Sequence, residues 1–256
     1  MKIWPIFKKE MRLYATSPIA YVVFFIFLVV MGWFFSQILN YFAMASMRSA
    51  MNPSMGRDLN VTESVMRPLF GNISVILVLA LMPFLTMRLL AEERQTGTIE
   101  LLLTYPVRDW EVLLGKYLAV FGLYTVLIAL TLLYPLMLAY FARLEWGTVL
   151  SGYLGLLLMG SSFLAVGLFA SSLTVSQIVA AAWTFGILLL LWVIGWGADT
   201  LGGTWGKVLQ HLSTMEHNDN FAKGVLDTKD VLYYVNLTLL ALFLAYRSVE
   251  ARRWKG

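Results

Sequence analysis

Cysteine is absent from the 256 residues, and charged residues make up only 13% of them. Without cysteine the chain can form no disulfide framework and has no thiol chemistry. A soluble domain carries about twice this share of charged residues. Together with a hydrophobic content of 59%, this low charge indicates a membrane protein.

The chain also lacks the phosphate-binding loop of an ATPase, GxxxxGK followed by serine or threonine. The nearest match, GTWGKV at residues 203–208, has the wrong spacing and the wrong last residue. Its two histidines, His211 and His217, lack the HExxH spacing of a metalloprotease, and we expect them at the surface. We therefore predict that the chain is not an enzyme and that it has no catalytic residue, bound cofactor or metal.

Long apolar runs are what the sequence does contain, and about 20 such residues span the hydrocarbon core of a membrane. We predict six transmembrane helices at about residues 19–39, 70–87, 113–141, 149–170, 178–197 and 231–246. No run has an acid, a base or a histidine in its apolar body, which argues against an ion-coupled transporter or a membrane protease. The predicted fold class is an all-α integral membrane protein, with one domain over residues 1–256. Small residues in the fourth run would allow close helix contacts: Gly152, Gly155, Gly160, Ser161 and Gly167.

Six spans place both termini on the same side of the membrane. Of the nineteen lysines and arginines, twelve fall on the terminal side and seven on the other. The positive-inside rule then predicts cytoplasmic termini and outward-facing segments at residues 40–69 and 198–230. The net charge of +4 reflects this flanking pattern, so we expect no nucleic-acid partner. Residues 198–230 either bind an extracytoplasmic partner protein or form a cap of short helices.

Residues 1–17 form a basic amphipathic segment. Apolar residues recur at helical spacing: Trp4, Phe7, Met11 and Tyr14. Between them lie the cations Lys8, Lys9 and Arg12. A helix lying in the membrane interface would bury the apolar stripe and leave the cations at the headgroups.

Residues 88–116, RLLAEERQTGTIELLLTYPVRDWEVLLGK, are a long charged segment between two very apolar ones. Thr98 can cap a short helix, because its hydroxyl can accept from a free backbone N–H. Pro106 ends that helix, since proline cannot donate the helix hydrogen bond. The segment is either a small amphipathic helix held at the membrane face or an ordinary solvated loop.

The same segment resembles the stretch between the second and third spans of type-2 ABC exporter permeases. The family pattern is roughly E-E-[KR]-x-x-G-T-[IL]-E-x-L-L-x-x-P, followed by Gly-Lys at the start of the next span. The matching residues are Glu92, Glu93, Arg94, Gly97, Thr98, Ile99, Glu100, Leu102, Leu103, Pro106, Gly115 and Lys116. Two further stretches, GLFASSLTVSQIVAA (167–181) and FAKGVLDTKDVLYY (221–234), resemble the gliding-motility-type ABC transporter permease. The nitrous-oxide-reductase maturation permease is similar in plan.

The resemblance implies a six-helix permease with an interfacial connecting helix at residues 1–17 and a cytoplasmic coupling loop at residues 88–116. Such a permease pairs with a second permease chain, identical or different, and with two copies of an ATP-binding subunit that hold ATP and Mg. It lies in a bacterial inner membrane and couples ATP hydrolysis to export. The alternative is a mechanotransmitting scaffold that drives an extracytoplasmic partner without moving a substrate. Spans without charge suit a lipid-like or polymeric substrate, or none.

The resemblance also assigns the residues that would contact the ATP-binding subunit. In the coupling loop they are Glu92, Glu93, Arg94, Gly97, Thr98, Ile99, Glu100, Leu101 and Leu102. Gly97 would permit the turn before the short helix, because glycine tolerates positive φ. The resemblance assigns Trp4, Phe7, Lys8 and Met11 to the connecting helix, which would lie beside the coupling helix.

Overall fold

A computed structural model describes residues 3–51, 60–97, 108–201 and 203–253. Helices account for nearly all of these residues, and there is no strand among them, which confirms the predicted all-α fold class. In chain order the elements are α1 (Ile3–Thr16), α2 (Pro18–Met51), η2 (Thr62–Met66), η3 (Leu69–Ile73), α3 (Ser74–Thr86), α4 (Ala91–Gln95), α6 (Asp109–Thr131), α7 (Leu133–Phe141), α8 (Trp146–Leu173), α9 (Gln177–Leu201), α10 (Gly203–Leu212), α11 (Thr214–Ala222) and α12 (Thr228–Arg253).

Six helical stretches within the described residues are long and apolar enough to cross a membrane, which confirms the predicted number and order. They are Pro18–Met51, Thr62–Gln95, Asp109–Phe141, Trp146–Leu173, Gln177–Gly197 and Thr228–Ala251. Each extends past the apolar run that predicted it. A helix satisfies its own backbone hydrogen bonds, so it does not need apolar side chains to continue.

Helix α8 is the centre of the bundle. It packs against α3, α6, α9, α11 and α12, and 72% of its most apolar stretch is buried, against 17% for α2. The predicted small residues make this possible, because large side chains from neighbouring helices occupy the space above them. Phe70 covers Gly152, Phe221 covers Gly155 and Tyr124 covers Gly160. Close contact through small residues is how membrane helices pack without a hydrophobic driving force.

The second span is not one regular helix. It starts with two π-helical segments, η2 and η3, and the backbone leaves helical geometry at Gly71, where φ is −77° and ψ is −122°. Asn218 of α11 donates from Nδ2 to the carbonyl oxygen of Phe70 at 2.9 Å. A break in a buried helix frees backbone groups that need partners, and here a side chain from another helix supplies one.

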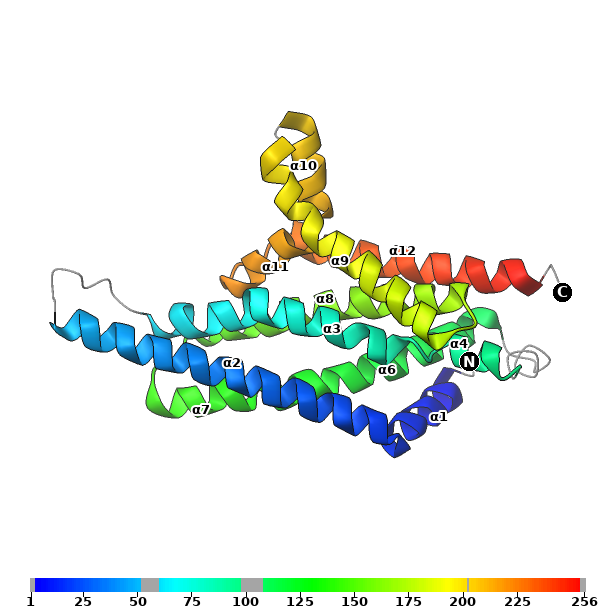
Figure 1. The fold of residues 1–256 in the computed structure, drawn as a ribbon, viewed down its shortest axis with the longest axis horizontal. Coiled ribbons are helices and arrows are strands. Elements are labelled where there is room, and N and C mark those ends of the chain that lie inside the picture. The colour runs from blue at the N-terminus through cyan, green and yellow to red at the C-terminus, as the bar shows by residue number, and fades with distance from the viewer. Residues whose placement is uncertain (1–2, 52–59, 98–107, 202, 254–256) are drawn as a thin grey trace.

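Figure 1 shows α2, α3, α8 and α12 running along the long axis of the molecule. Both chain termini and α4 lie at one end, which we call the terminal end, and α1 is set at an angle to α2 there. The segment at residues 198–230, which is expected to face outward, contains two short helices, α10 and α11. Helix α11 packs on α8 and α9, whereas α10 projects from the side of the bundle (Figure 1).

Candidate functional site

Helix α1 crosses the first part of α6 at two glycines. A Cβ atom on Gly115 would lie 2.8 Å from Cγ2 of Ile6, and one on Gly122 would lie 3.7 Å from the ring of Phe7. The first distance is too short for a real contact, so only glycine at position 115 permits α1 to lie this close. The approach brings Glu10 of α1 next to Lys116 of α6.

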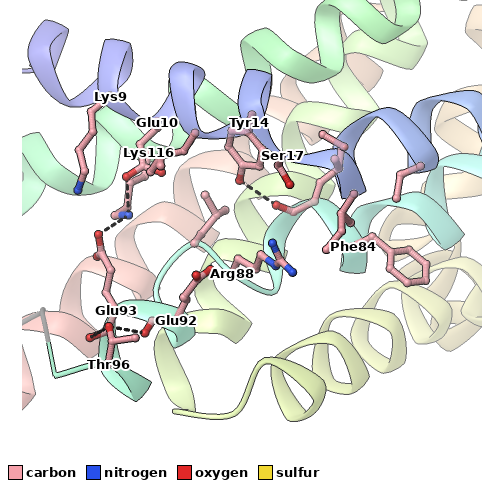
Figure 2. A pocket seen from close by; sticks show the side chains of 16 residues that line it. Lys9, Glu10, Tyr14, Ser17, Phe84, Arg88, Glu92, Glu93, Thr96 and Lys116 are labelled. Carbon is pink, nitrogen blue, oxygen red and sulfur yellow. Dashed lines mark hydrogen bonds and ion pairs between the residues drawn. The ribbon is translucent and has the colours of Figure 1, made fainter.

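Lys116 is held between two carboxylates from other elements. Its Nζ lies 2.9 Å from Oε1 of Glu10 and 2.8 Å from Oε1 of Glu93 in α4. Lys116 and Glu10 are buried and Glu93 is partly buried, with exposed side-chain fractions of 3%, 9% and 14%, respectively. We call Glu10, Glu93 and Lys116 the Lys116 cluster; it joins α1, α4 and α6, as Figure 2 shows.

The burial of this cluster makes each member depend on the others. Moving a charge out of water costs several kcal/mol, and only close partners with good geometry offset that cost. Removing one partner leaves an uncompensated charge in the interior, which destabilises a protein by about 3–5 kcal/mol. The cluster therefore fixes α1 and α4 relative to the spanning helix α6.

A second set of contacts fixes the chain where α3 gives way to α4. Ser171 of α8 accepts from the backbone N–H groups of Leu90 at 3.1 Å and Ala91 at 3.0 Å. Its hydroxyl also lies 3.3 Å from the carbonyl oxygen of Met87, to which it can donate. Ser171 thus holds the backbone between α3 and α4 against the central helix α8.

Tyr14 completes the attachment of α1. Its hydroxyl donates to the carbonyl oxygen of Leu85 at 3.1 Å. Burial, and to a lesser degree the nearby Glu10 carboxylate, raises the pKa of the Tyr14 phenol far above its usual value. The phenol therefore remains a neutral hydrogen-bond donor throughout the physiological range.

The residues predicted for the connecting helix share one face of α1 but differ in how far they are buried. Phe7 and Met11 are half-buried and face Gly122 of α6. Trp4 is 70% exposed, and Lys8 is exposed as well. The apolar stripe therefore packs partly on the protein itself, and the part left for a membrane or a partner is smaller than the pattern predicts.

The residues predicted for the coupling loop are only partly described. Glu92 is exposed, Arg94 is half-buried and Glu93 binds Lys116. Gly97 has a φ of 70°, which confirms the predicted turn. The remaining predicted residues lie outside the described part of the chain: Thr98, Ile99, Glu100, Leu101 and Leu102.

Sequence reasoning missed the Lys116 cluster. The charge pattern groups Lys116 with the cations that flank the membrane, but the structure buries it near the start of the third span. Two signals were present in the sequence. Glu10 is the only acid in the basic helix α1, and Lys116 directly follows the glycine that lets α1 approach.

A second buried polar cluster lies among α11 and α12. Nδ1 of His217 is 2.6 Å from Oδ1 of Asp230, and Asn220 donates from Nδ2 to the other oxygen of Asp230 at 2.8 Å. The ring of His217 stacks on Tyr233 with centroids 4.0 Å apart. The expectation that both histidines are surface residues is therefore wrong for His217, which is 8% exposed, and holds for His211.

His217, Asn220 and Asp230 form the Asp230 cluster, which lines a polar cavity of about 480 Å³. The side chains of this cluster are already engaged with one another. Among the described residues, no group of three or more histidine or acidic side chains is placed to hold a metal ion.

Taken together, the described residues form an all-helical protein with six candidate spans and a charged cluster that ties its terminal end together. These features define a multi-pass membrane protein. Residues 4–249 match the family described as ABC-2 family transporter protein. Because the match covers nearly the whole chain, the chain belongs to this family and is a permease component of an ABC transporter. A comparison with curated proteins finds no match.

Proposed function

We propose that this permease couples ATP hydrolysis by a separate ATP-binding subunit to export across the membrane. The observation that supports this role is the Lys116 cluster. A force applied to the chain after α4 would reach the spanning helix α6 through Glu93 and Lys116, and helix α1 through Glu10. Two buried ion pairs transmit such a movement more stiffly than a solvated loop, because closely packed interiors resist deformation.

The contact with the ATP-binding subunit would lie at the terminal end. Exposed Glu92 and the exposed Trp4 and Lys8 of α1 all lie in elements of that end. Residues 98–102 would form the coupling helix that enters the partner. Glu93 would position this segment through Lys116, and Arg94 and Gly97 would set its direction.

The proposed assembly contains two permease chains, identical or different, and two ATP-binding subunits that hold ATP and Mg. We place it in a bacterial inner membrane with both termini in the cytoplasm. The shared location of the termini (Figure 1) and the excess of cations on that side support this orientation. The resemblance of residues 167–181 and 221–234 supports a permease of the gliding-motility type, and the single core cluster supports one domain over residues 1–256.

The docking test is co-purification in detergent with a co-expressed ATP-binding subunit. The test variant is Leu102→Asp, and the matched control is Leu226→Asp, the same change at a 61% exposed leucine in the turn between α11 and α12. We expect wild type and the control to retain the ATP-binding subunit and Leu102→Asp to lose it. Glu93 is unsuitable for this test, since its replacement would also disturb Lys116.

A result in which wild type retains no ATP-binding subunit would refute the proposed coupling. Equal retention by all three proteins would instead refute the placement of the contact at residues 98–102. ATPase rates of the co-purified complexes provide a second measurement, because an undocked subunit cannot respond to the permease.

A second candidate function is mechanotransmission to a partner outside the membrane. Helix α10 presents Trp205, Val208 and Leu212 at spacings of three and four residues, which places them on one helix face. These side chains are 75%, 44% and 44% exposed, respectively. An exporter in vesicles should show ATPase activity stimulated by a lipid-like or polymeric substrate, whereas a mechanotransmitter should lose function with Trp205→Glu while its ATPase rate stays unchanged.

A further inference from the structure

A cavity of about 350 Å³ is lined by the Lys116 cluster and by other residues of α1, the start of α2, the end of α3, α4 and α6. Figure 2 shows the side chains around it. One part of its wall is polar and comes from α1, α4 and the end of the second span. The other part is apolar and comes from α2 and α3, which belong to the first two candidate spans.

Arg88 lines this cavity, and its hydrogen bonding is incomplete. Its Nε atom is buried and has no hydrogen-bond partner in the structure. Among the described residues, none of the ion pairs involves Arg88. A buried polar atom without a partner is rare and costs free energy. A guanidinium offers five donors in a plane and suits the oxygens of phosphate or carboxylate.

The neighbouring polar groups do not accept a hydrogen bond from Nε of Arg88. Tyr14 already donates to the carbonyl oxygen of Leu85, and a phenol O–H pointed there is not an anion. Glu10 and Glu93 are both bound to Lys116. Lys9 and Glu92 are both exposed on the wall of the same cavity, which adds a second cation and a further carboxylate. The buried Nε of Arg88 therefore remains a donor without an acceptor, although carboxylates line the same cavity.

The apolar wall indicates what carries that acceptor. Ala20 and Val23 line it, together with Ile19 and Phe84, which are 43% and 55% exposed at the surface of the bundle. Since both helices belong to candidate spans, these exposed side chains face hydrocarbon in a membrane. The cavity is therefore continuous with the lipid-facing surface and has its cations at one end.

We propose that this cavity binds a phosphate-bearing amphiphile, with the phosphate on Arg88 and Lys9 and the acyl chains along Ala20, Val23 and Phe84. A phosphate would satisfy the guanidinium through charge-assisted hydrogen bonds. The apolar wall favours a membrane phospholipid over free phosphate as its source. Arg88 and Lys9, which would hold the phosphate, are not among the residues proposed to contact the ATP-binding subunit, so either proposal can fail alone.

The test measures binding to the purified, delipidated full chain by native mass spectrometry. The three probes are dioctanoyl phosphatidylethanolamine, dioctanoyl glycerol and inorganic phosphate. The variant Arg88→Gln removes the cation, and the matched control Arg247→Gln removes another arginine, one paired with Glu250 on α12. A third variant, Ala20→Trp, fills the apolar part of the cavity and leaves its cations in place.

We expect one phospholipid per wild-type chain and much weaker binding of dioctanoyl glycerol. Arg88→Gln should weaken phospholipid binding roughly ten- to a hundredfold, as expected for lost charge-assisted hydrogen bonds, and Arg247→Gln should leave it unchanged. Arg88→Gln should not lower the thermal stability of the lipid-free chain, since it removes an unpartnered buried group. A purely structural arginine would behave in the opposite way.

The remaining outcomes separate the sources of phosphate and the ways the proposal can fail. Inorganic phosphate that binds as tightly as the lipid, and still binds Ala20→Trp, would support the phosphate site with a free anion as its ligand. Equal binding of the phospholipid and dioctanoyl glycerol would overturn the proposal, as would unchanged binding by Arg88→Gln. If Arg88→Gln fails to fold, Ala20→Trp provides the test of lipid binding. Phospholipid binding retained by Ala20→Trp would overturn the proposal.

Discussion

The Lys116 cluster and the Asp230 cluster both bury charged side chains, but they connect very different parts of the chain. Lys116 and Glu10 are 106 residues apart, whereas Asp230 lies 13 residues from His217 and 10 from Asn220. The first cluster fixes α1 and α4 on a spanning helix. The second closes a local turn, where Gly224 adopts a φ of 84° between α11 and α12. The Lys116 cluster thus positions elements that are far apart in the sequence, whereas the Asp230 cluster stabilises a local turn.

The most severe test of this contrast is Lys116→Met. The variant leaves Glu10 and Glu93 buried without their cation, so we expect a loss of about 3–5 kcal/mol in the free energy of unfolding. Denaturation by SDS in bicelles would measure it. In complexes that still assemble, the ATPase rate should no longer respond to the permease.

The triple variant Glu10→Gln/Glu93→Gln/Lys116→Met is the control. Because it removes all three charges together, we expect it to recover most of the lost stability. It should still fail to couple, since the ion pairs that join α4 to α6 are missing. A single Lys116→Met variant as stable as wild type would show that the cluster is not a structural connection.

Asp230→Ala should have the next largest effect. It leaves the Nδ1–H of His217 and the Nδ2–H of Asn220 without their acceptor in a buried site, at an expected cost of about 2–3 kcal/mol. Hydrogen exchange should increase in α11 and the start of α12 and remain unchanged in α1 and α4. If coupling to ATP hydrolysis fell as far as in Lys116→Met, the division into long-range and local clusters would be wrong.

Much of the fold could be predicted from the sequence because membrane spans are specified by simple physical limits. Six apolar runs predicted six helices, the small residues of the fourth run predicted its close helix contacts, and Gly97 predicted a turn with positive φ. Each of these follows from local composition. No long-range pairing had to be known.

The clusters could not be predicted because they depend on which elements meet. Lys116 looks like a flanking cation until Gly115 is seen to admit Ile6 and thereby Glu10. His217 looks like a surface residue until α11 folds back on α12. Arg88 gave no signal at all, since its unpartnered Nε is a property of the cavity around it. The proposed contact at residues 98–102 stays a prediction.

Gly160→Ala tests the helix that lies between the two clusters. Its added methyl would enter the space held by the ring of Tyr124, whose hydroxyl donates to the carbonyl oxygen of Leu156 at 2.9 Å. We expect a loss of about 2 kcal/mol from overpacking. The matched control is Gly186→Ala in α9, where a Cβ would meet nothing within 4 Å among the described residues. Equal stability of the two variants would contradict the close packing of α8.

Ser171→Ala should have the smallest effect on stability. It tests whether the position of α4 depends on α8 as well as on Lys116. The change removes the acceptor of the Leu90 and Ala91 N–H groups, and we expect a loss of about 1 kcal/mol. Ser172→Ala is the neighbouring control, because the Ser172 hydroxyl donates to the carbonyl oxygen of Phe169 in its own helix.

Hydrogen exchange at Leu90 and Ala91 distinguishes the two serine variants more sharply than global stability does. Exchange there should increase in Ser171→Ala and stay at the wild-type rate in Ser172→Ala, because only the first change frees these amides. If the Lys116 cluster alone positions α4, the amides will exchange at the same rate in both variants. If α8 shares that task, the faster exchange should be accompanied by weaker stimulation of ATP hydrolysis, with the Lys116 ion pairs still intact.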